Sequence, residues 1–252
     1  MKRNNNNFCN IEERTIQKES NLLSGIKTGI PIAIGYVPIA IAFGLLAKAN
    51  GIPNHISISM SLMVFAGASQ FIAVNLLALG TGYWEIIMTT FIVNLRHFLM
   101  SAALTPSIDQ NMTKDKLAIL SFGITDETFS MLSLQEENKL EFPFVLGLNL
   151  IAYSAWVGGT AIGVFLGSGL PQIVQSSMGI ALYVMFIGLL IPNLRKSHPF
   201  LIVSIIAIII NSSLNWISIF SSLSTGWTII ITTIMASIAG AILFPKDGEK
   251  NE

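Results

Sequence analysis

The chain has 252 residues, of which 52% are hydrophobic and only 11% charged, and its mean hydropathy is +0.66. Soluble domains carry about 25% charged residues, so this composition excludes an ordinary soluble protein. Residues 142–194 contain no Asp, Glu, Lys or Arg. A bilayer takes roughly 20 helical residues per crossing, so this run accommodates two crossings and a turn. We expect an all-α fold, a polytopic helical membrane protein.

The N-terminal residues 1–21 are polar and lack the continuous apolar core of a signal peptide. We expect them to form a solvated cytoplasmic tail, followed by one transmembrane domain at 22–245 and a second cytoplasmic tail at 246–252. The single Cys9 cannot form an intramolecular disulfide and argues against a thiolate metal site. No basic tract indicates nucleic acid, and no motif indicates a metal or another cofactor.

Proline, glycine and charge divide the transmembrane domain into about eight candidate crossings. They are expected at 28–47, 56–80, 86–105, 117–134, 143–167, 172–192, 199–219 and 226–244. With eight crossings and the N-terminus inside, ten Lys and Arg residues of the tails and loops are cytoplasmic and three are outside. This asymmetry favours a multi-pass protein of a bacterial inner membrane with both termini in the cytoplasm.

A weak internal repeat is visible at an offset of 118 residues. "NGIPNHISISMS" at 50–61 aligns with "SGLPQIVQSSMG" at 168–179, and the matches include Pro53 with Pro171. Chance can produce such a match, because the same residue types recur throughout apolar chains. A true repeat would fit a transporter, since many transporters are built from two related halves.

The first two crossings contain features that favour irregular helices. In the first, Pro31 and Pro38 remove backbone donors, and Gly44 lies near the end of the segment. Such kinks either line a site or serve packing alone. In the second, "FAGASQF" combines small residues with Ser69 and Gln70. Small residues indicate close helix packing, whereas an amide in mid membrane favours a binding role.

The third crossing, at 86–105, has Arg96 and His97 near the expected bilayer midplane. The nearest interface is roughly 13 Å away at 1.5 Å per residue, which is beyond comfortable reach of an arginine. Charged side chains at that depth usually face a partner or a cavity. We therefore predict a functional site here.

A polar stripe follows the same helix at helical spacing, through Thr90, Asn94, His97 and Ser101. Either this stripe lines a site or it joins helices by hydrogen bonds. Arg96 lies about 100° away from His97 on a straight helix. Either the helix is interrupted near Asn94, or Arg96 faces a different neighbour.

The fourth segment, at 117–134, contains Asp126 and Glu127 at its middle. Carboxylates at membrane depth need counter-charges or protons, so Arg96 is expected to pair with one acid and leave the other free to titrate. The alternative is an amphipathic helix in the interface with both acids in water.

Several of these motifs occur together in a known family. "SLMVFAGASQF" at 61–71, "NLRH" at 94–97 and "TDETF" at 125–129, with the proline-rich first crossing and "GGTAIG" at 158–163, resemble the AzlC family of branched-chain amino acid permeases. The resemblance extends from about residue 22 to 190. It implies the large subunit of an exporter for valine, leucine and isoleucine that acts with a small membrane subunit of the AzlD type.

The residues suggest how such a substrate would bind. Arg96 and Asn94, with Ser69 and Gln70, are expected to hold the amino acid, its carboxylate facing Arg96 and its ammonium facing Asp126 or Glu127. His97 or the remaining acid would carry a coupling proton. The alternatives are a passive channel and an intramembrane enzyme using Ser69, His97 and Asp126. No catalytic motif supports the enzyme, so we expect none.

Overall fold

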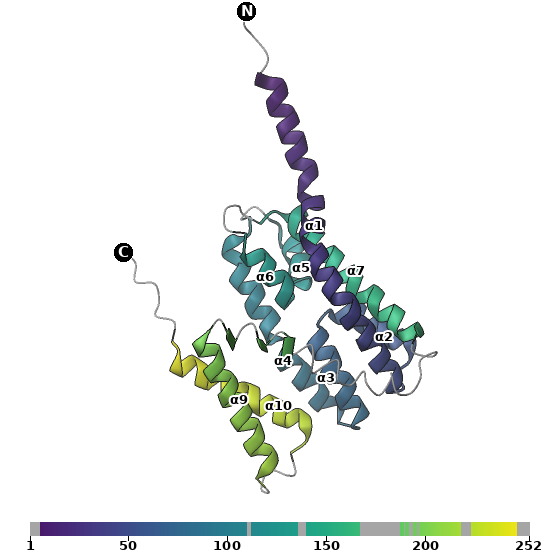
Figure 1. The fold of residues 1–252 in the computed structure, drawn as a ribbon, viewed down its shortest axis with the longest axis vertical. Helices are drawn as coiled ribbons and strands as arrows, with labels where there is room; N and C mark the ends of the chain where they lie inside the picture. Colours follow the sequence, from purple (N-terminus) through teal and green to yellow (C-terminus); the bar gives the residue numbers. More distant parts are fainter. Residues whose placement is uncertain are drawn as a thin grey trace, which may run out of the picture. The chain divides into compact units, whose positions relative to one another are not determined.

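The computed structural model describes residues 6–109, 112–135, 140–166, 187–188, 190–191, 194–195, 197–217 and 223–245. In these parts of the chain the regular elements are helical (Figure 1). The expected crossing at 172–192 lies mainly outside the described residues, as does the second copy of the 118-residue repeat. The repeat and the number of eight crossings therefore stay predictions.

Five helices of the described residues are long and apolar enough to cross a membrane. The membrane-length segments are Leu22–Ala49 of α1 (Asn6–Ala49), Tyr83–Ser107, which contains α4 (Tyr83–Leu104), α7 (Phe142–Leu166), α9 (His198–Trp216) and α10 (Thr225–Leu243). Each corresponds to an expected crossing. The all-helical, polytopic class predicted from the sequence is confirmed.

Two of the expected crossings are not single helices. Segment 56–80 is divided into α2 (Asn54–Val64) and α3 (Gly67–Ala78), because Phe65 adopts a left-handed conformation with φ 41°. Segment 117–134 is divided into α5 (Lys114–Phe122) and α6 (Asp126–Ser133). Discontinuous helices of this kind expose backbone groups at membrane depth and are common in transporters.

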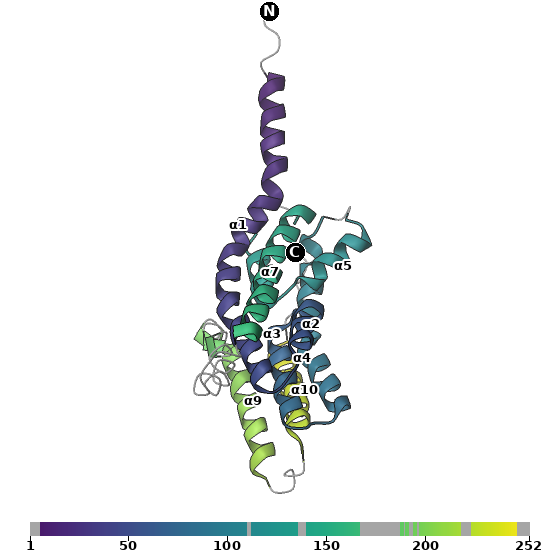
Figure 2. The same cartoon turned by 90° about the vertical axis from the view of Figure 1, so that its right-hand side faces the viewer.

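The chain forms two compact units, and the boundaries fall after Gly67, after Leu95 within α4, and at 171–172. In the first unit α7 lies side by side with the C-terminal part of α1, and the N-terminal part of α1 extends beyond it (Figures 1 and 2). α2, α5 and α6 pack against α7, and α6 also contacts α1. In the second unit α9 and α10 pack against each other.

Glycines explain how α1 and α7 approach so closely. A Cβ atom added to Gly44 would overlap the carbonyl oxygen of Thr160, and one added to Gly163 would overlap that of Ile41. α1 continues as a helix through both Pro31 and Pro38. The structure thus gives Gly44 a packing role. The kink expected at Gly44, Pro31 and Pro38 stays a prediction.

Candidate functional site

Arg96 forms an ion pair with Asp126 across two helices. Its Nη1 atom lies 2.6 Å from Asp126 Oδ2, and both side chains are about one third exposed, at 35% and 34%. The sequence left open whether the helix is interrupted near Asn94 or Arg96 faces a different neighbour from His97. α4 is a continuous helix through Asn94 and Arg96, so the second alternative is correct. Arg96 faces a different neighbour, and the predicted pairing with one of the two acids is confirmed.

The break between α5 and α6 positions Asp126. Thr125 caps α6: its hydroxyl accepts from the Thr128 amide at 3.3 Å, and the Thr125 amide donates to Thr128 Oγ1 at 2.7 Å. This reciprocal capping box fixes the direction in which the helix begins. Asp126 and Glu127 then occupy its first turn, where carboxylates are favoured by the helix dipole.

His97 contacts the same break. Its Nδ1 atom lies 2.8 Å from the carbonyl oxygen of Ile124. A carbonyl only accepts hydrogen bonds, so Nδ1 carries the hydrogen and Nε2 of the neutral ring is an acceptor. Within the described residues Nε2 has no hydrogen-bond partner. His97 is therefore oriented by the backbone and keeps one nitrogen available.

Glu127 does not join the ion pair but contacts α1. The buried hydroxyl of Tyr36 donates to Glu127 Oε2 at 2.5 Å and lies 2.6 Å from Thr125 Oγ1. Consecutive acids therefore attach α6 to different helices, Asp126 to α4 and Glu127 to α1. Arg96 is paired with Asp126 alone, so Glu127 has no positively charged partner among the described residues.

The other helix break, at Phe65, also contacts Tyr36. Its ring meets Phe65 edge to face, with 6.3 Å between ring centroids, and Trp156 of α7 at 5.5 Å. Phe65 in turn contacts Phe122, the last residue of α5, at 6.3 Å. Non-glycine residues in left-handed conformations persist where their surroundings hold them, often at functional sites. Both discontinuous helices therefore converge on one tyrosine.

Four polar atoms of α4 are buried without a hydrogen-bond partner among the described residues, and three of them lie close together in the sequence: Asn94 Oδ1, Arg96 Nε and His97 Nε2, the fourth being Thr89 Oγ1. Buried polar atoms are normally paired, since leaving one unpaired costs about 1–3 kcal/mol. One donor and two acceptors beside an ion pair form a set that a small zwitterion would satisfy. These atoms offer a donor at Arg96 and acceptors at Asn94 and His97.

A groove of about 670 Å³ adjoins His97 between α4 and α5. Apart from His97, Thr105 and two serines, the residues that line it are apolar, namely Phe98, Ala102, Ile108, Leu117, Ala118 and Phe122. Drug-sized ligands bind in pockets of about 300–1,000 Å³ lined in this way. The groove has the size and lining that an aliphatic side chain needs.

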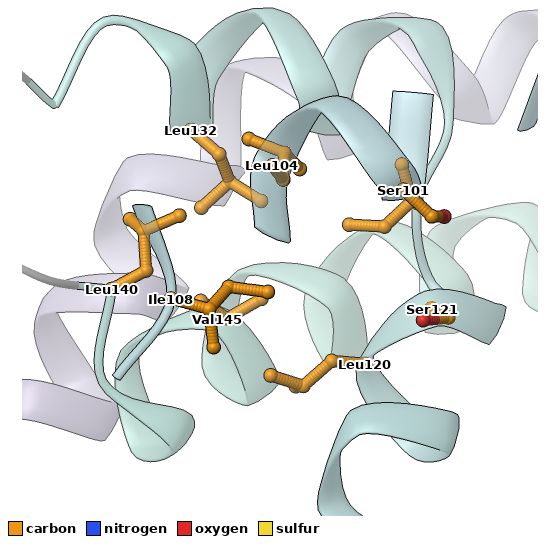
Figure 3. A pocket seen from close by; sticks show the side chains of 9 residues that line it. Ser101, Leu104, Ile108, Leu120, Ser121, Leu132, Leu140 and Val145 are labelled. Atoms are coloured by element: carbon orange, nitrogen blue, oxygen red, sulfur yellow. The ribbon is translucent and has the colours of Figure 1, made fainter. Parts of the chain in front are cut away.

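A second, much smaller cavity of about 10 Å³ shares some of its lining residues with the groove (Figure 3). Leu104, Leu120, Leu132, Leu140 and Val145 surround it, and Ser101 and Ser121 line both spaces. The volume corresponds to about one water molecule. The two serines thus bring hydroxyl groups to an otherwise apolar wall.

Other sequence-predicted residues have different surroundings. Ser69 and Gln70 are buried on the first turn of α3, which belongs to the second unit, and the cluster of the first unit is described without them. Of the predicted polar stripe, Thr90 donates to the Ile86 carbonyl of its own helix at 2.8 Å. The described residues contain no group of three His, Cys, Asp or Glu side chains that could hold a metal.

Sequence reasoning missed Tyr36 and Thr125. A tyrosine between two prolines of an apolar helix was a signal that a hydroxyl needed a partner at membrane depth. Thr125 after Gly123, followed by two acids, has the composition of a helix start. Both signals are local, but only the fold brings these residues together.

The chain has long apolar helices, two segments that are broken at their middle, and polar side chains gathered at one of the breaks. These features define the class of the protein, which is a helical membrane protein. The sequence model described as AzlC protein matches residues 31–170. The chain belongs to the AzlC family, and the resemblance predicted from its motifs is confirmed.

Several relatives agree with this assignment. The inner membrane protein YgaZ of Escherichia coli strain K12 is 33% identical over 71% of this chain and 76% of its own length. An uncharacterized membrane protein of Archaeoglobus fulgidus is 35% identical over 73% of this chain and 81% of its own length. The branched-chain amino acid transport protein AzlC of Bacillus subtilis is 31% identical over 55% of each chain. No solved structure matches the chain.

Proposed function

We propose that this chain is the large subunit of a secondary transporter that exports branched-chain amino acids across a bacterial inner membrane. The observation that carries the proposal is the set of unpaired buried atoms beside the Arg96–Asp126 ion pair, where a discontinuous helix begins. Transporters of several folds bind substrate where helices are interrupted. The substrate class comes from the name of the Bacillus subtilis relative, which is a branched-chain amino acid transport protein.

The residues of the site divide the work of holding an amino acid. Arg96, through its unpaired Nε, and Asn94, through its amide NH2 group, hold the substrate carboxylate, while Asp126 or Glu127 accepts from the ammonium. Ser69 and Gln70 stay binding residues predicted from the sequence alone. The groove beside His97 takes the aliphatic side chain, and His97 or the remaining acid carries a proton in antiport.

The test is export of preloaded radiolabelled valine or leucine from cells that express the chain. Efflux is measured with and without a small AzlD-type membrane subunit, and with an uncoupler. The proposal predicts faster efflux that requires the small subunit and disappears when the proton gradient collapses. Efflux that persists in the uncoupler indicates a passive channel. Alanine variants of Arg96 and Asp126 that export normally would exclude the site.

The membrane topology belongs to the same proposal, with tails at 1–21 and 246–252 in the cytoplasm and eight crossings within 22–245. Cys9 is the single cysteine, so a membrane-impermeant maleimide reports the location of the N-terminal tail directly. Protection in intact cells and labelling after permeabilisation place it inside. In a Cys9→Ser background, Lys114→Cys and Lys139→Cys flank segment 117–134 and label from opposite sides only if that segment crosses.

A further inference from the structure

The acids of α6 differ in what their partners can do. Asp126 faces Arg96, whose guanidinium only donates hydrogen bonds. A protonated Asp126 would therefore lose its ion pair and find no acceptor on Arg96. Glu127 faces the Tyr36 hydroxyl, which both donates and accepts. Only the Glu127 contact survives a change of charge on the carboxyl group.

We infer that Glu127 is the residue that binds and releases the coupling proton, and that Tyr36 and Thr125 are positioning residues that keep it hydrogen-bonded in both charge states. That the proton is coupled to transport rests on the proposed function, whereas the assignment of the proton to Glu127 rests on geometry alone. It divides the roles that the sequence left open between Asp126, Glu127 and His97.

With Glu127 ionised, the hydrogen bonds run in one direction. Thr125 donates to the oxygen of Tyr36 across 2.6 Å, and Tyr36 donates to Glu127 Oε2 across 2.5 Å. Thr125 Oγ1 still accepts from the Thr128 amide at 3.3 Å. Every hydroxyl hydrogen of the chain then has an acceptor.

With Glu127 protonated, the same chain reverses. Hydronium transfers a proton to Oε2 and leaves as water, and the new O–H donates to the Tyr36 oxygen. Tyr36 turns its hydrogen to Thr125 Oγ1, and Thr125 donates to Thr128 Oγ1, which lies 3.3 Å away. The Thr128 hydroxyl donates a hydrogen bond to the Gly123 carbonyl oxygen at 3.1 Å. No buried group loses its partner, so both states are accommodated without moving a helix.

The surroundings of Glu127 favour reversible protonation of its carboxyl group over a permanent ion pair with a basic side chain. Arg96 and His97 of α4 and Asp126 of α6 are the charged or titratable groups that share its electrostatic environment with Tyr36 of α1. Arg96 is already paired with Asp126. α7, which also contacts α6, contains no acid, base or histidine. The uncompensated charge of the cluster therefore falls on Glu127.

Infrared difference spectroscopy of the full chain in phosphatidylcholine–phosphatidylglycerol liposomes tests this without any substrate. Among the carbonyl bands of protonated carboxyl groups that appear as the pH falls, one should belong to Glu127. Glu127→Gln should abolish that band, whereas Asp126→Asn should keep it. Tyr36→Phe should retain the band at a shifted frequency, because the protonated carboxyl loses its acceptor.

Tyr153→Phe is the matched control, since its hydroxyl also bonds within the first unit, to the Leu62 carbonyl at 2.8 Å, but contacts neither acid. That variant should leave the band unchanged in frequency. A band that persists in Glu127→Gln, or one that Tyr153→Phe shifts as much as Tyr36→Phe, would overturn the inference. Because no amino acid is added, a failure of the export assay leaves this result interpretable.

Discussion

In the first unit, α7 and α6 both lie against α1, but different kinds of contact hold them. α1 and α7 meet at glycines where an added Cβ would overlap the opposite helix, namely Gly25, Gly29, Gly44, Gly147, Gly159 and Gly163. α6 has only eight residues and is attached through Glu127 to Tyr36 and through Asp126 to Arg96. Close packing of backbones does not depend on charge. The attachment of α6 does, so the site combines a fixed scaffold with a charge-dependent element.

The largest effect is expected from filling the glycine seam. Gly44→Leu should destabilise the protein by about 3 kcal/mol, because the new side chain must displace the backbone of α7. This lowers the unfolding temperature in detergent by about 5–10 °C. The control is Gly35→Leu on the same helix, where an added Cβ meets nothing within 4 Å. Equal losses in both variants would mean that the seam is not what fixes α1 to α7.

A smaller effect is expected from the ion pair. Arg96→Met and Asp126→Asn, singly and together, form a double-mutant cycle with an expected coupling energy of about 1 kcal/mol, since both side chains are partly exposed. Unfolding in denaturant measures the three variants. Arg96→Lys keeps the charge and should retain part of the coupling. Strictly additive losses would show that the charges do not attach α6 to α4.

The cap of α6 should contribute a similar or slightly smaller amount. Thr125→Ala removes the side-chain acceptor of the Thr128 amide and should cost about 1 kcal/mol. Thr125→Ser keeps the hydroxyl and should restore most of the stability. Hydrogen exchange at the amides of α6 reports the change locally, and exchange that accelerates equally in α7 would contradict a charge- and cap-dependent attachment confined to α6.

The smallest effect is expected in the second unit, where an acid is held without any positive side chain among the described residues. Glu85 of α4 accepts from the Ser224 hydroxyl and, at 3.2 Å, from the Trp227 amide at the start of α10. Glu85→Gln removes the charge from a helix N-terminus and should cost about 0.5 kcal/mol. Thermal unfolding of the variant checks this. A loss of stability as large as that of Arg96→Met would show that Glu85 is held as strongly as Asp126, the partner of Arg96.

The sequence predicted the long spans because apolar composition fixes them, and it predicted the Arg96–Asp126 pair because opposite charges at membrane depth need each other. It predicted an irregular helix at "FAGASQF", where the break at Phe65 lies, but not the left-handed conformation of Phe65 or the break before Thr125. Phe65 carries no local signal for a left-handed conformation, which its contacts with Tyr36 and Tyr153 hold in place. The role of Glu127 was left open between candidates for the same reason, since only the fold brings a tyrosine of α1 to it.

The most direct test of the central claim is valine binding to the purified protein in lipid nanodiscs, measured by calorimetry. If Arg96 holds the substrate carboxylate, the unaltered chain releases heat on binding valine or leucine, and Arg96→Ala abolishes this heat while Gly35→Ala does not. Valine binding of equal strength in Arg96→Ala would contradict the account, because the unpaired guanidinium nitrogen beside Asp126 would then have no part in holding the substrate.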